Sequence, residues 1–352
     1  MEIVPIPTKR ATVVEIARRA AVGTATVDRV LNARQGVREE TRQRVEQAKA
    51  AIEQGIPAGP SKKPWRLKVL LPELAGASTE YLGQCFQEFG ALRHATIECV
   101  FTKKMQPALL ARKLRACAGH GLDAVAFQAL EDPRVHNAVD YLHSLNIPTL
   151  GLLSGLANRH LIGTAGVDNR AAGRTAGFLM GRMAQQTGSV AIVTGGQLYR
   201  IHEDREMGFR AALRSGFPNI SNAIVINGHD DASEIYRVVR EALDRHPDLV
   251  GIYNVGGGSE GIARAMREVE VADELVFIGH NLTERTQSYL LDGTMDIVLH
   301  LNMREVAASA TDAMIAHLEN RPTSLRPLPT SVVTRENIVG MSLSPSSANW
   351  SR

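Results

Sequence analysis

Three neighbouring residues near the amino terminus have side chains suited to reading the edge of a DNA base pair. Thr24, Ala25 and Arg29 fall on one side of a short helical pattern. An arginine can donate two parallel hydrogen bonds to O6 and N7 of guanine, and an alanine offers apolar contact to a thymine methyl group. Thr24 and Thr26 can donate to phosphate or cap the helix. This set predicts base reading in a major groove.

A second set of residues lies in loops that follow short apolar runs in the rest of the chain. A tyrosine ring can stack on the apolar face of a sugar, while carboxylate, amide and guanidinium groups hold its hydroxyls. Such a mixture is typical of a carbohydrate site. The candidate ligand-binding residues are Tyr81, Glu131, Ser154, Arg205, His280 and Asn281.

A glycine-rich loop at 256–261 fits two enzyme motifs at once. Its glycines have the G-x-G-x-x-G spacing of a dinucleotide-binding turn, and Ser259 is the centre of a G-x-S-x-G nucleophile elbow. Asp273 would be the ribose-binding acid, but it precedes the next apolar run instead of ending it. An aspartate and His300 follow Ser259 in triad order, but no His-Gly-Gly oxyanion segment precedes it. We therefore favour a glycine-rich turn that lines a ligand cleft.

Other chemistries have little support in the sequence. No H-x-x-x-H pair, acid cluster or Cys/His set predicts a metal, and no cofactor is expected. The three cysteines are widely spaced, as small core residues in a reducing compartment would be. No run approaches the length of a membrane span, and the first ten residues lack the apolar segment of a secretory signal. We expect a cytoplasmic protein without membrane contact.

Three helical patterns in residues 12–54 must position the first set. Thr12 and Glu15 form a capping box before the first pattern, a turn containing Gly23 leads to the second at 24–32, and the third covers 38–54. Two short helices joined by a tight turn and braced by a third make a helix-turn-helix. The second helix would expose its first residues to the groove while its back face stays packed.

Positive charge is concentrated in the same segment. The whole chain has 352 residues and a net charge of +3. Because 44% of its residues are hydrophobic and 22% charged, this composition excludes a disordered or fibrous protein. The first 64 residues carry twelve Lys and Arg against seven acids, a net charge of +5, and the remaining 288 carry −2. This asymmetry is typical of a small polyanion-binding head on a neutral body.

From Trp65 onward, aliphatic or β-branched runs alternate with helical patterns. This alternation predicts parallel sheets with helices on both faces, and about 275 residues is large for one open sheet, so two lobes are expected. Ligands of such sheets bind beyond the carboxyl ends of the strands, where the second set of residues lies. The expected strands are 67–71, 97–101, 124–127, 148–152, 190–194, 223–226, 249–253, 275–279 and 296–299.

The basic head resembles the headpiece of the lactose/galactose repressor family of bacterial transcription regulators. The similarity runs through 12–32 and 36–45 and is most specific in the segment Thr26-Val-x-Arg-Val-Leu-Asn32. It implies a DNA-binding head. The candidate DNA-binding residues are Thr12, Thr24, Ala25, Thr26, Arg29, Asn32, Lys62 and Lys63.

The head departs from this family in two places. Relatives usually carry Ser or Thr where this chain has Gly23 or Asp28, and a carboxylate at position 28 would repel a nearby phosphate. Relatives also follow the third helix with a hinge helix whose Leu enters the minor groove. Here three prolines and two glycines in 55–64 favour an extended linker. Lys62 and Lys63 in this linker are expected to contact phosphates.

The body, from about 67 to 340, resembles the periplasmic sugar-binding-protein-like core that this family fuses to its head. The pair Asp168-Asn169 is similar to the family's lobe-crossover signature, and the segment at Arg205 is similar to its Arg-x-x-Gly-Phe, whose Arg binds ligand. By the same resemblance Asn281 and Glu131 belong to the ligand set. Gly256 joins the set at a position where relatives often carry a polar residue.

The resulting fold class is α/β, with an N-terminal three-helix helix-turn-helix head and a two-lobed, periplasmic-binding-protein-like (type I) body of parallel sheets flanked by helices. The expected boundaries are 1–55 for the head, 56–64 for a linker, 65–340 for the ligand-binding body and 341–352 for a flexible tail. Lobe one is expected at 65–165 and 294–320, and lobe two at 166–293 and 321–340.

These features predict a homodimeric, ligand-responsive transcription regulator, a repressor in the first instance, that senses a small sugar, polyol or sugar acid. Two heads are expected to bind a palindromic DNA operator because one short helix reads only a few base pairs. The alternative is a cytoplasmic α/β enzyme, either dinucleotide-dependent or a serine hydrolase, that uses the 256–261 loop. The head and the missing signal segment disfavour a secreted transport-binding protein.

Overall fold

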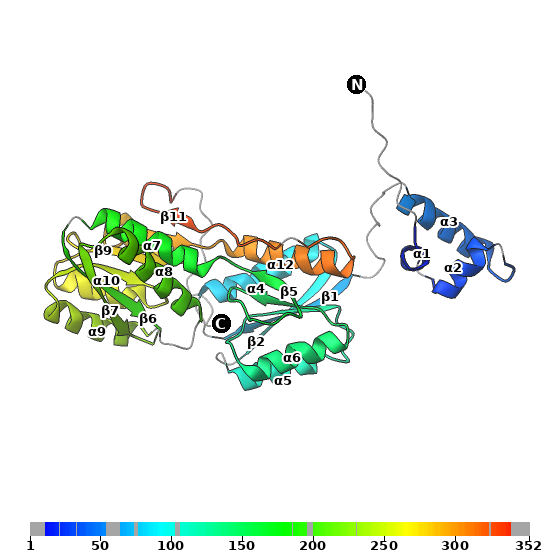
Figure 1. The fold of residues 1–352 in the computed structure, drawn as a ribbon, viewed down its shortest axis with the longest axis horizontal. Helices are drawn as coiled ribbons and strands as arrows, with labels where there is room; N and C mark the ends of the chain where they lie inside the picture. Colours follow the sequence, from blue (N-terminus) through cyan, green and yellow to red (C-terminus); the bar gives the residue numbers. More distant parts are fainter. Residues whose placement is uncertain are drawn as a thin grey trace, which may run out of the picture. The chain divides into compact units, whose positions relative to one another are not determined.

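The computed structural model describes residues 11–20, 22–32, 34–53, 64–73, 77–102, 106–184, 186–195, 200–229, 231–323 and 325–338. Two compact units divide the chain, Met1–Pro64 and Trp65–Arg352 (Figure 1). Of the expected linker at 56–64 only Pro64 lies within the described ranges, and the expected tail at 341–352 lies outside them.

The described part of the head contains the three predicted helices, α1 (Val13–Arg19), α2 (Thr24–Leu31) and α3 (Glu39–Glu53). The predicted capping box begins α1: the Thr12 N–H donates to Oε2 of Glu15 at 2.9 Å, and the Glu15 N–H donates to Oγ1 of Thr12 at 3.3 Å. Apolar side chains of all three helices meet in one small core. Its buried members are Ile16, Ala17, Ala20, Val27, Val30, Val45 and Ala48.

The first lobe of the body is built on a parallel sheet in the order β2-β1-β3-β4-β5. Its strands in the described ranges are β1 (Trp65–Pro72), β2 (Ala95–Thr102), β3 (Ala124–Phe127), β4 (Thr149–Leu152) and β5 (Leu161–Ala165). Helices α4 (Ala77–Leu92) and α12 (Met303–Leu318) pack on one face of this sheet, and α5 (Pro107–Ala116) and α6 (Pro133–Ser144) pack on the other (Figure 1). The carboxyl ends of β3 and β4 carry two of the candidate ligand residues.

The second lobe is built on a sheet in the order β11-β10-β9-β8-β6-β7, in which β11 alone runs antiparallel among the described strands. Its strands are β6 (Gly188–Thr194), β7 (Ile220–Asn227), β8 (Leu249–Asn254), β9 (Val276–His280), β10 (Ile297–His300) and β11 (Ser331–Val333). Helices α7 (Asn169–Met183) and α8 (Arg200–Gly216) cover one face. The other face is covered by α9 (Ala232–Arg245), α10 (Ser259–Glu268) and α11 (Glu284–Leu291).

Two parts of this arrangement differ from the expectation. Residues 294–320 were expected in lobe one, but β10 pairs in parallel with β9 in the second sheet, and only α12 belongs to lobe one. The chain therefore crosses after β10, at 301–302. Strands β5 and β11 were not expected. The half-buried pattern of β5 and the φ of +154° at Gly163 leave no apolar run to detect, and β11 has only three residues.

Helices α7 and α8 approach each other so closely that glycine is required at their contact. A Cβ on Gly173 of α7 would lie 2.0 Å from the carbonyl oxygen of Arg205, and one on Gly208 of α8 would lie 2.1 Å from the carbonyl oxygen of Arg170. No real Cβ tolerates such distances without a backbone shift. The glycines thus set the position of the Arg205 backbone at the base of the cleft between the lobes.

A polar pair lies inside the core of lobe two. The ring of Tyr253 stacks on Phe209 at 4.5 Å, and its hydroxyl lies 2.8 Å from Nε2 of His280, which is 5% exposed. Burial lowers the pKa of His280 well below 6.5, and the positive charge of Arg205 lowers it further. His280 is therefore neutral in the folded protein at neutral pH.

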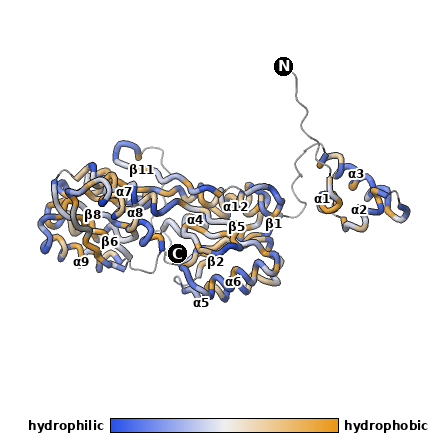
Figure 2. Tube along the Cα trace, in the orientation of Figure 1, coloured by the Kyte–Doolittle hydropathy of each residue, from blue (hydrophilic) through white to orange (hydrophobic). Residues whose placement is uncertain are grey.

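Hydropathy follows the same layers. In Figure 2 hydrophobic and hydrophilic stretches alternate along the outer helices, which is typical of helices with one buried face. Among the helices of the described ranges, none is both long and apolar enough to pass through a bilayer.

The glycine contact between α7 and α8 leads to a stability prediction. We expect Gly173→Ala to lower the free energy of unfolding by about 1–3 kcal/mol or more, because its methyl group has no room beside Arg205. Gly216→Ala, at the end of α8, is the matched control because a Cβ there meets nothing within 4 Å. Urea unfolding at 25 °C measures both. Equal effects of the two substitutions would contradict the role assigned to the contact.

The buried imidazole leads to a pH prediction. Below pH 6.5 the unfolded chain protonates this histidine while the folded protein does not, so stability is present above that pH and is lost as the pH falls. Between pH 7.5 and 5.5 this one group should account for a loss of about 1.4 kcal/mol. His280→Gln removes the titrating group, so the acid-side loss in urea unfolding should shrink by that amount. An unchanged loss would show that His280 titrates normally in the fold.

Candidate functional site

The exposed side of α2 presents the predicted base-reading residues. Thr24, Ala25 and Arg29 are exposed, and Val27 and Val30 are buried against the rest of the head. The N-cap of α2 is Gly23, without a side-chain cap, so neither candidate threonine caps this helix. Thr26 is half-buried. The helix therefore offers an exposed polar stripe with one arginine, whose contact with DNA stays a prediction.

Two other candidates of the head are engaged within the protein. The hydroxyl of Thr12 donates to Oε2 of Glu15 at 2.8 Å, so Thr12 belongs to the capping box. The amide of Asn32 donates to the backbone carbonyl of Asp28 at 2.9 Å and to its Oδ1 at 2.8 Å. The positions of Lys62 and Lys63 lie outside the described residues.

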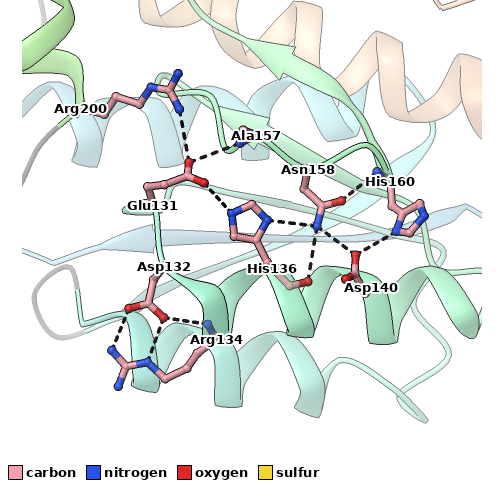
Figure 3. Close-up of polar contacts among 9 residues, drawn as sticks. All are labelled: Glu131, Asp132, Arg134, His136, Asp140, Ala157, Asn158, His160 and Arg200. Atoms are coloured by element: carbon pink, nitrogen blue, oxygen red, sulfur yellow. Dashed lines mark hydrogen bonds and ion pairs between the residues drawn. The ribbon is translucent and has the colours of Figure 1, made fainter.

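Glu131 and Ser154 lie at neighbouring strand ends in lobe one. The Ser154 hydroxyl donates to the carbonyl of Ala129 at 3.1 Å. The carboxylate of Glu131 accepts from Nε2 of His136 at 2.5 Å and from the backbone N–H of Ala157 at 3.3 Å (Figure 3). Glu131 thus has two donors from its own lobe.

His136 is itself held by a chain of polar contacts that continues along α6. The amide of Asn158 lies 3.4 Å from Nδ1 of His136 and donates to Oδ1 of Asp140 at 2.9 Å (Figure 3). Nδ1 of His160 lies 2.9 Å from the same carboxylate oxygen. The hydrogen bond from Asn158 is the main cause of a lowered pKa of Asp140, and the bond from His160 adds to it. The contacts of Asp140, Asn158 and His136 hold the Glu131 carboxylate in place. Sequence inspection missed this chain of contacts because its members are up to 22 residues apart.

The first turn of α8 reaches from lobe two to lobe one. Nη1 of Arg200 lies 3.4 Å from Oε2 of Glu131, and the neighbouring Ile201 packs against the hydrophobic core of lobe one. Within α8, Nε of Arg200 lies 3.8 Å from Oδ2 of Asp204. The ion pair of Arg200 and Glu131, called here the cleft pair, therefore joins the two lobes. Figure 3 shows Arg200 approaching the carboxylate from the opposite side to His136.

Arg205 lies deeper than expected for a residue that only contacts ligand. It is 8% exposed, its Nε donates to Oδ1 of Asn169 at 3.1 Å, and its Nη1 donates to the carbonyl of Val255 at 2.7 Å. The amide of Asn169 in turn donates to the carbonyl of Leu153 in lobe one at 3.4 Å. Arg205 therefore links α8 to the start of α7 and to the end of β8, beside Gly256.

Asn281 stands at the carboxyl end of β9 in a left-handed conformation, with φ of +66°. Asparagine tolerates this conformation better than most residues. Its N–H donates to the carbonyl of Leu299 at 3.1 Å, and its carbonyl accepts from the hydroxyl of Thr286 at 2.9 Å. Gly256, Arg205, His280 and Asn281 thus gather at one end of the lobe-two sheet, with His280 in the core behind the others.

Tyr81 does not join this group. Its ring packs against the core of lobe one, and its hydroxyl interacts with Cys85 of α4 and Arg304 of α12. Burial raises the pKa of Tyr81, in agreement with a ring held between two helices. Its place in the ligand set stays a prediction.

A cavity of about 340 Å³ opens where two chain crossings between the lobes lie side by side. Its polar lining comes from both sides of the crossing, and its volume is within the usual range for a small ligand. Asp168 accepts from the N–H of Ala171 at 2.9 Å and caps α7, which positions the crossing. The polar side chains that line the cavity are Thr164, Asp168, Asn169, Arg200 and Asp204.

The glycine loop is explained by packing and loop closure. Gly258 has φ of +74° and caps α10, and a Cβ on Gly261 would lie 2.2 Å from the carbonyl oxygen of Ala232 in α9. The Ser259 hydroxyl accepts from the amide of Asn254 at 3.0 Å. Nδ1 of His300 accepts from the N–H of Leu282 at 3.1 Å, so these contacts assemble no serine–histidine pair. In the described ranges no three His, Cys, Asp or Glu residues gather as metal ligands.

Comparison with protein families gives two matches. Residues 12–53 match the family described as bacterial regulatory proteins, lacI family. Residues 83–322, about two thirds of the chain, match the periplasmic binding protein domain. A search of curated proteins finds no match.

Solved structures resemble the body at low sequence identity. A glucose-galactose binding protein, GanP, from Geobacillus stearothermophilus is 19% identical with a TM-score of 0.72 and covers 79% of this chain and 100% of that one. An ABC-transporter solute-binding protein from Burkholderia graminis, in complex with D-arabinose, is 20% identical with a TM-score of 0.75, covering 81% and 100%. A candidate LacI transcriptional regulator from Bacteroides fragilis is 19% identical with a TM-score of 0.70, covering 78% and 99%.

The two family matches follow the two structural units. The head has the helix-turn-helix with its exposed polar stripe, and the body has two α/β lobes joined by repeated chain crossings. Neither the contacts of the glycine loop nor the family matches support the enzyme alternative. The chain therefore belongs to the lacI family of bacterial regulatory proteins, as a ligand-responsive DNA-binding regulator whose body is a periplasmic binding protein domain.

Proposed function

We propose that the protein is a homodimeric cytoplasmic repressor. Its affinity for DNA is controlled by a small neutral carbohydrate or polyol bound between the lobes. The observation that carries this proposal is the cleft pair, because it joins the two lobes beside the polar cavity. A ligand that enters there must contact or replace a group that already bridges the lobes. Two similar structures, a glucose-galactose binding protein and a solute-binding protein in complex with D-arabinose, support a carbohydrate.

Charge around the cavity favours a neutral ligand over a sugar acid. Three carboxylates, those of Asp168, Asp204 and Glu131, lie at or beside the cavity. The guanidinium of Arg200 is the positive charge that lines it. The deeper Arg205 donates to the neutral acceptors Asn169 and Val255. Carboxylates accept hydrogen bonds from hydroxyls but repel a second carboxylate. A polyol therefore fits this lining better than a sugar acid does.

The cleft pair is suited to reversible opening because neither partner is left alone when it breaks. Glu131 retains the donors His136 and Ala157, and Arg200 retains Asp204 within α8. The cost of separation is therefore that of a half-exposed ion pair, about 0.2–1 kcal/mol. Such a small bias can be overcome by a ligand with different affinities for the two lobe arrangements, which is the requirement for allosteric coupling.

On the DNA side, the exposed stripe of α2 supplies the reading surface. A single eight-residue helix reaches few base pairs, so we propose that two heads related by a twofold axis bind half-sites about 10 bp apart. Arg29 reads a guanine in each half-site. The ligand releases the operator by changing the arrangement of the lobes that carry the two heads.

The function is tested by selecting duplexes from a randomised DNA pool with the purified full-length protein. We expect enrichment of a palindromic site. A thermal-shift screen of monosaccharides, polyols and sugar acids should then find a neutral member that raises the melting temperature. The same compound should weaken binding to the selected duplex. Failure to enrich any sequence, or stabilisation by sugar acids alone, would contradict the proposal.

The cleft pair is tested by the distance between the lobes in the ligand-free protein. Spin labels at Ser144→Cys in α6 and Ser215→Cys in α8 report it, because both serines are exposed and the native cysteines are wholly or largely buried. We expect Arg200→Gln to shift the ratio of separated to joined lobes by about 1.4- to 5-fold toward separation. Glu131→Gln should act in the same direction, and the double substitution should add little.

Arg210→Gln is the matched control for this experiment. Arg210 forms a 2.8 Å ion pair with Glu206 within α8, so its loss removes the same charge without touching the lobe contact. The distance distribution of this variant should equal that of the unmodified protein. Equal shifts in Arg200→Gln and Arg210→Gln would remove the cleft pair from the mechanism.

A further inference from the structure

A carboxylate lies on the side of α2 that reads DNA. Residues 25, 28, 29 and 32 recur at helical spacing opposite the buried Val27 and Val30. Asp28 is therefore on the same stripe as Arg29, so a helix that places Arg29 in the groove also brings the Asp28 carboxylate near the DNA. Because DNA carries one negative charge per about 1.7 Å of its axis, an uncompensated carboxylate on this stripe would weaken binding.

The structure provides compensation from just beyond the end of the helix. Nη1 of Arg34 lies 3.3 Å from Oδ2 of Asp28, while the other carboxylate oxygen accepts from the amide of Asn32 at 2.8 Å. The backbone N–H of Arg34 donates to the carbonyl of Arg29 at 2.8 Å. Both the backbone and the side chain of Arg34 are thus tied to the recognition helix, and the two oxygens of Asp28 have separate donors.

Arg34 keeps most of its donors available in this position. Its side chain is 65% exposed, and a guanidinium has five N–H donors, of which the contact with Asp28 uses a small part. A guanidinium can bridge a carboxylate on one edge and a phosphate on another. The exposed edge of Arg34 lies at the end of the stripe that already carries Arg29.

We propose that Arg34 is a DNA-contacting residue, positioned by Asp28 to bridge that carboxylate and a backbone phosphate. The pair, with Asn32, is then one recognition unit: Asp28 sets the place of the guanidinium, and the guanidinium makes Asp28 acceptable to DNA. The inference rests on DNA binding by the head and goes beyond it, because neither the resemblance nor the sequence pattern selected Arg34.

A purely structural role for the pair makes a different prediction. If Arg34 only fastened the end of α2, its loss would weaken folding of the head and leave the salt dependence of DNA binding per folded molecule unchanged. If Arg34 neutralises a phosphate, its loss lowers the slope of log affinity against log salt by about one. Salt dependence therefore separates the two roles.

The experiment measures binding by fluorescence anisotropy over a series of salt concentrations. Two probes are used: the duplex enriched from a randomised pool by the unmodified full-length protein, and a random-sequence duplex of equal length. Arg34→Ala should lower affinity for both at least tenfold at physiological salt and reduce the slope by about one. Arg34→Lys keeps the charge, so it should keep the slope. Circular dichroism melting checks that the head remains folded.

The positioning role of Asp28 is tested by a double-substitution cycle. Arg34→Ala leaves Asp28 uncompensated, so its effect should be at least threefold smaller when Asp28→Asn is already present. Asp28→Asn alone should raise affinity for the random duplex, because it frees a positive charge. A coupling of this size is expected only when the two side chains act on DNA together.

Arg335→Ala is the control for the loss of one positive charge. Arg335 in the body has the same 65% side-chain exposure and an ion pair with a neighbouring acid, Glu336. Its loss should change affinity less than twofold. The proposal is overturned if Arg34→Ala leaves affinity and slope unchanged, matches Arg335→Ala, or combines additively with Asp28→Asn. If the unmodified protein enriches no site, DNA reading by the head is overturned as well.

Discussion

A guanidinium inside a folded protein needs acceptors in fixed places, because the charge is costly to remove from water without them. Arg205 meets this requirement with a side-chain oxygen from the start of α7 and a backbone oxygen from the end of β8. Both acceptors are in place only if α7 and α8 touch backbone to backbone, which their glycines permit. The geometry of the lobe-two half of the cleft depends on this one buried charge, and through Asn169 it extends to the first lobe.

The two arginines at the start of α8 have different roles, although they lie only five residues apart. Arg205 is enclosed and has neutral partners, so it is a fixed part of the framework. Arg200 is half-exposed, and its ion pair with Glu131 crosses between the lobes. The start of α8 therefore carries both the buried contacts of Arg205 within lobe two and the half-exposed ion pair of Arg200 with lobe one. In the proposed mechanism, this combination keeps the internal geometry of lobe two while the two lobes change their relation to each other.

Much of this arrangement could be predicted from the sequence, and the rest has identifiable reasons for being missed. The alternation of apolar runs and helical patterns was sufficient for the two-sheet body, and the Thr12–Glu15 spacing for the start of the head. An apolar run such as 297–300 indicates a strand but does not indicate to which of the two sheets the strand belongs. The contact of Arg200 with Glu131 joins residues 69 positions apart, and no local pattern records it. Gly261 is required because α9 packs closely against it, whereas its spacing in the sequence resembles an enzyme motif.

The path of the chain has a consequence for synthesis. One face of the first sheet is completed by α12, whose residues Val306, Ala310 and Met314 are part of the lobe-one core. Between β5 and this helix the ribosome must produce nearly the whole of the second lobe. The hydrophobic core of the earlier lobe can therefore be completed only after residue 318 has been made, when most of the later lobe is already present.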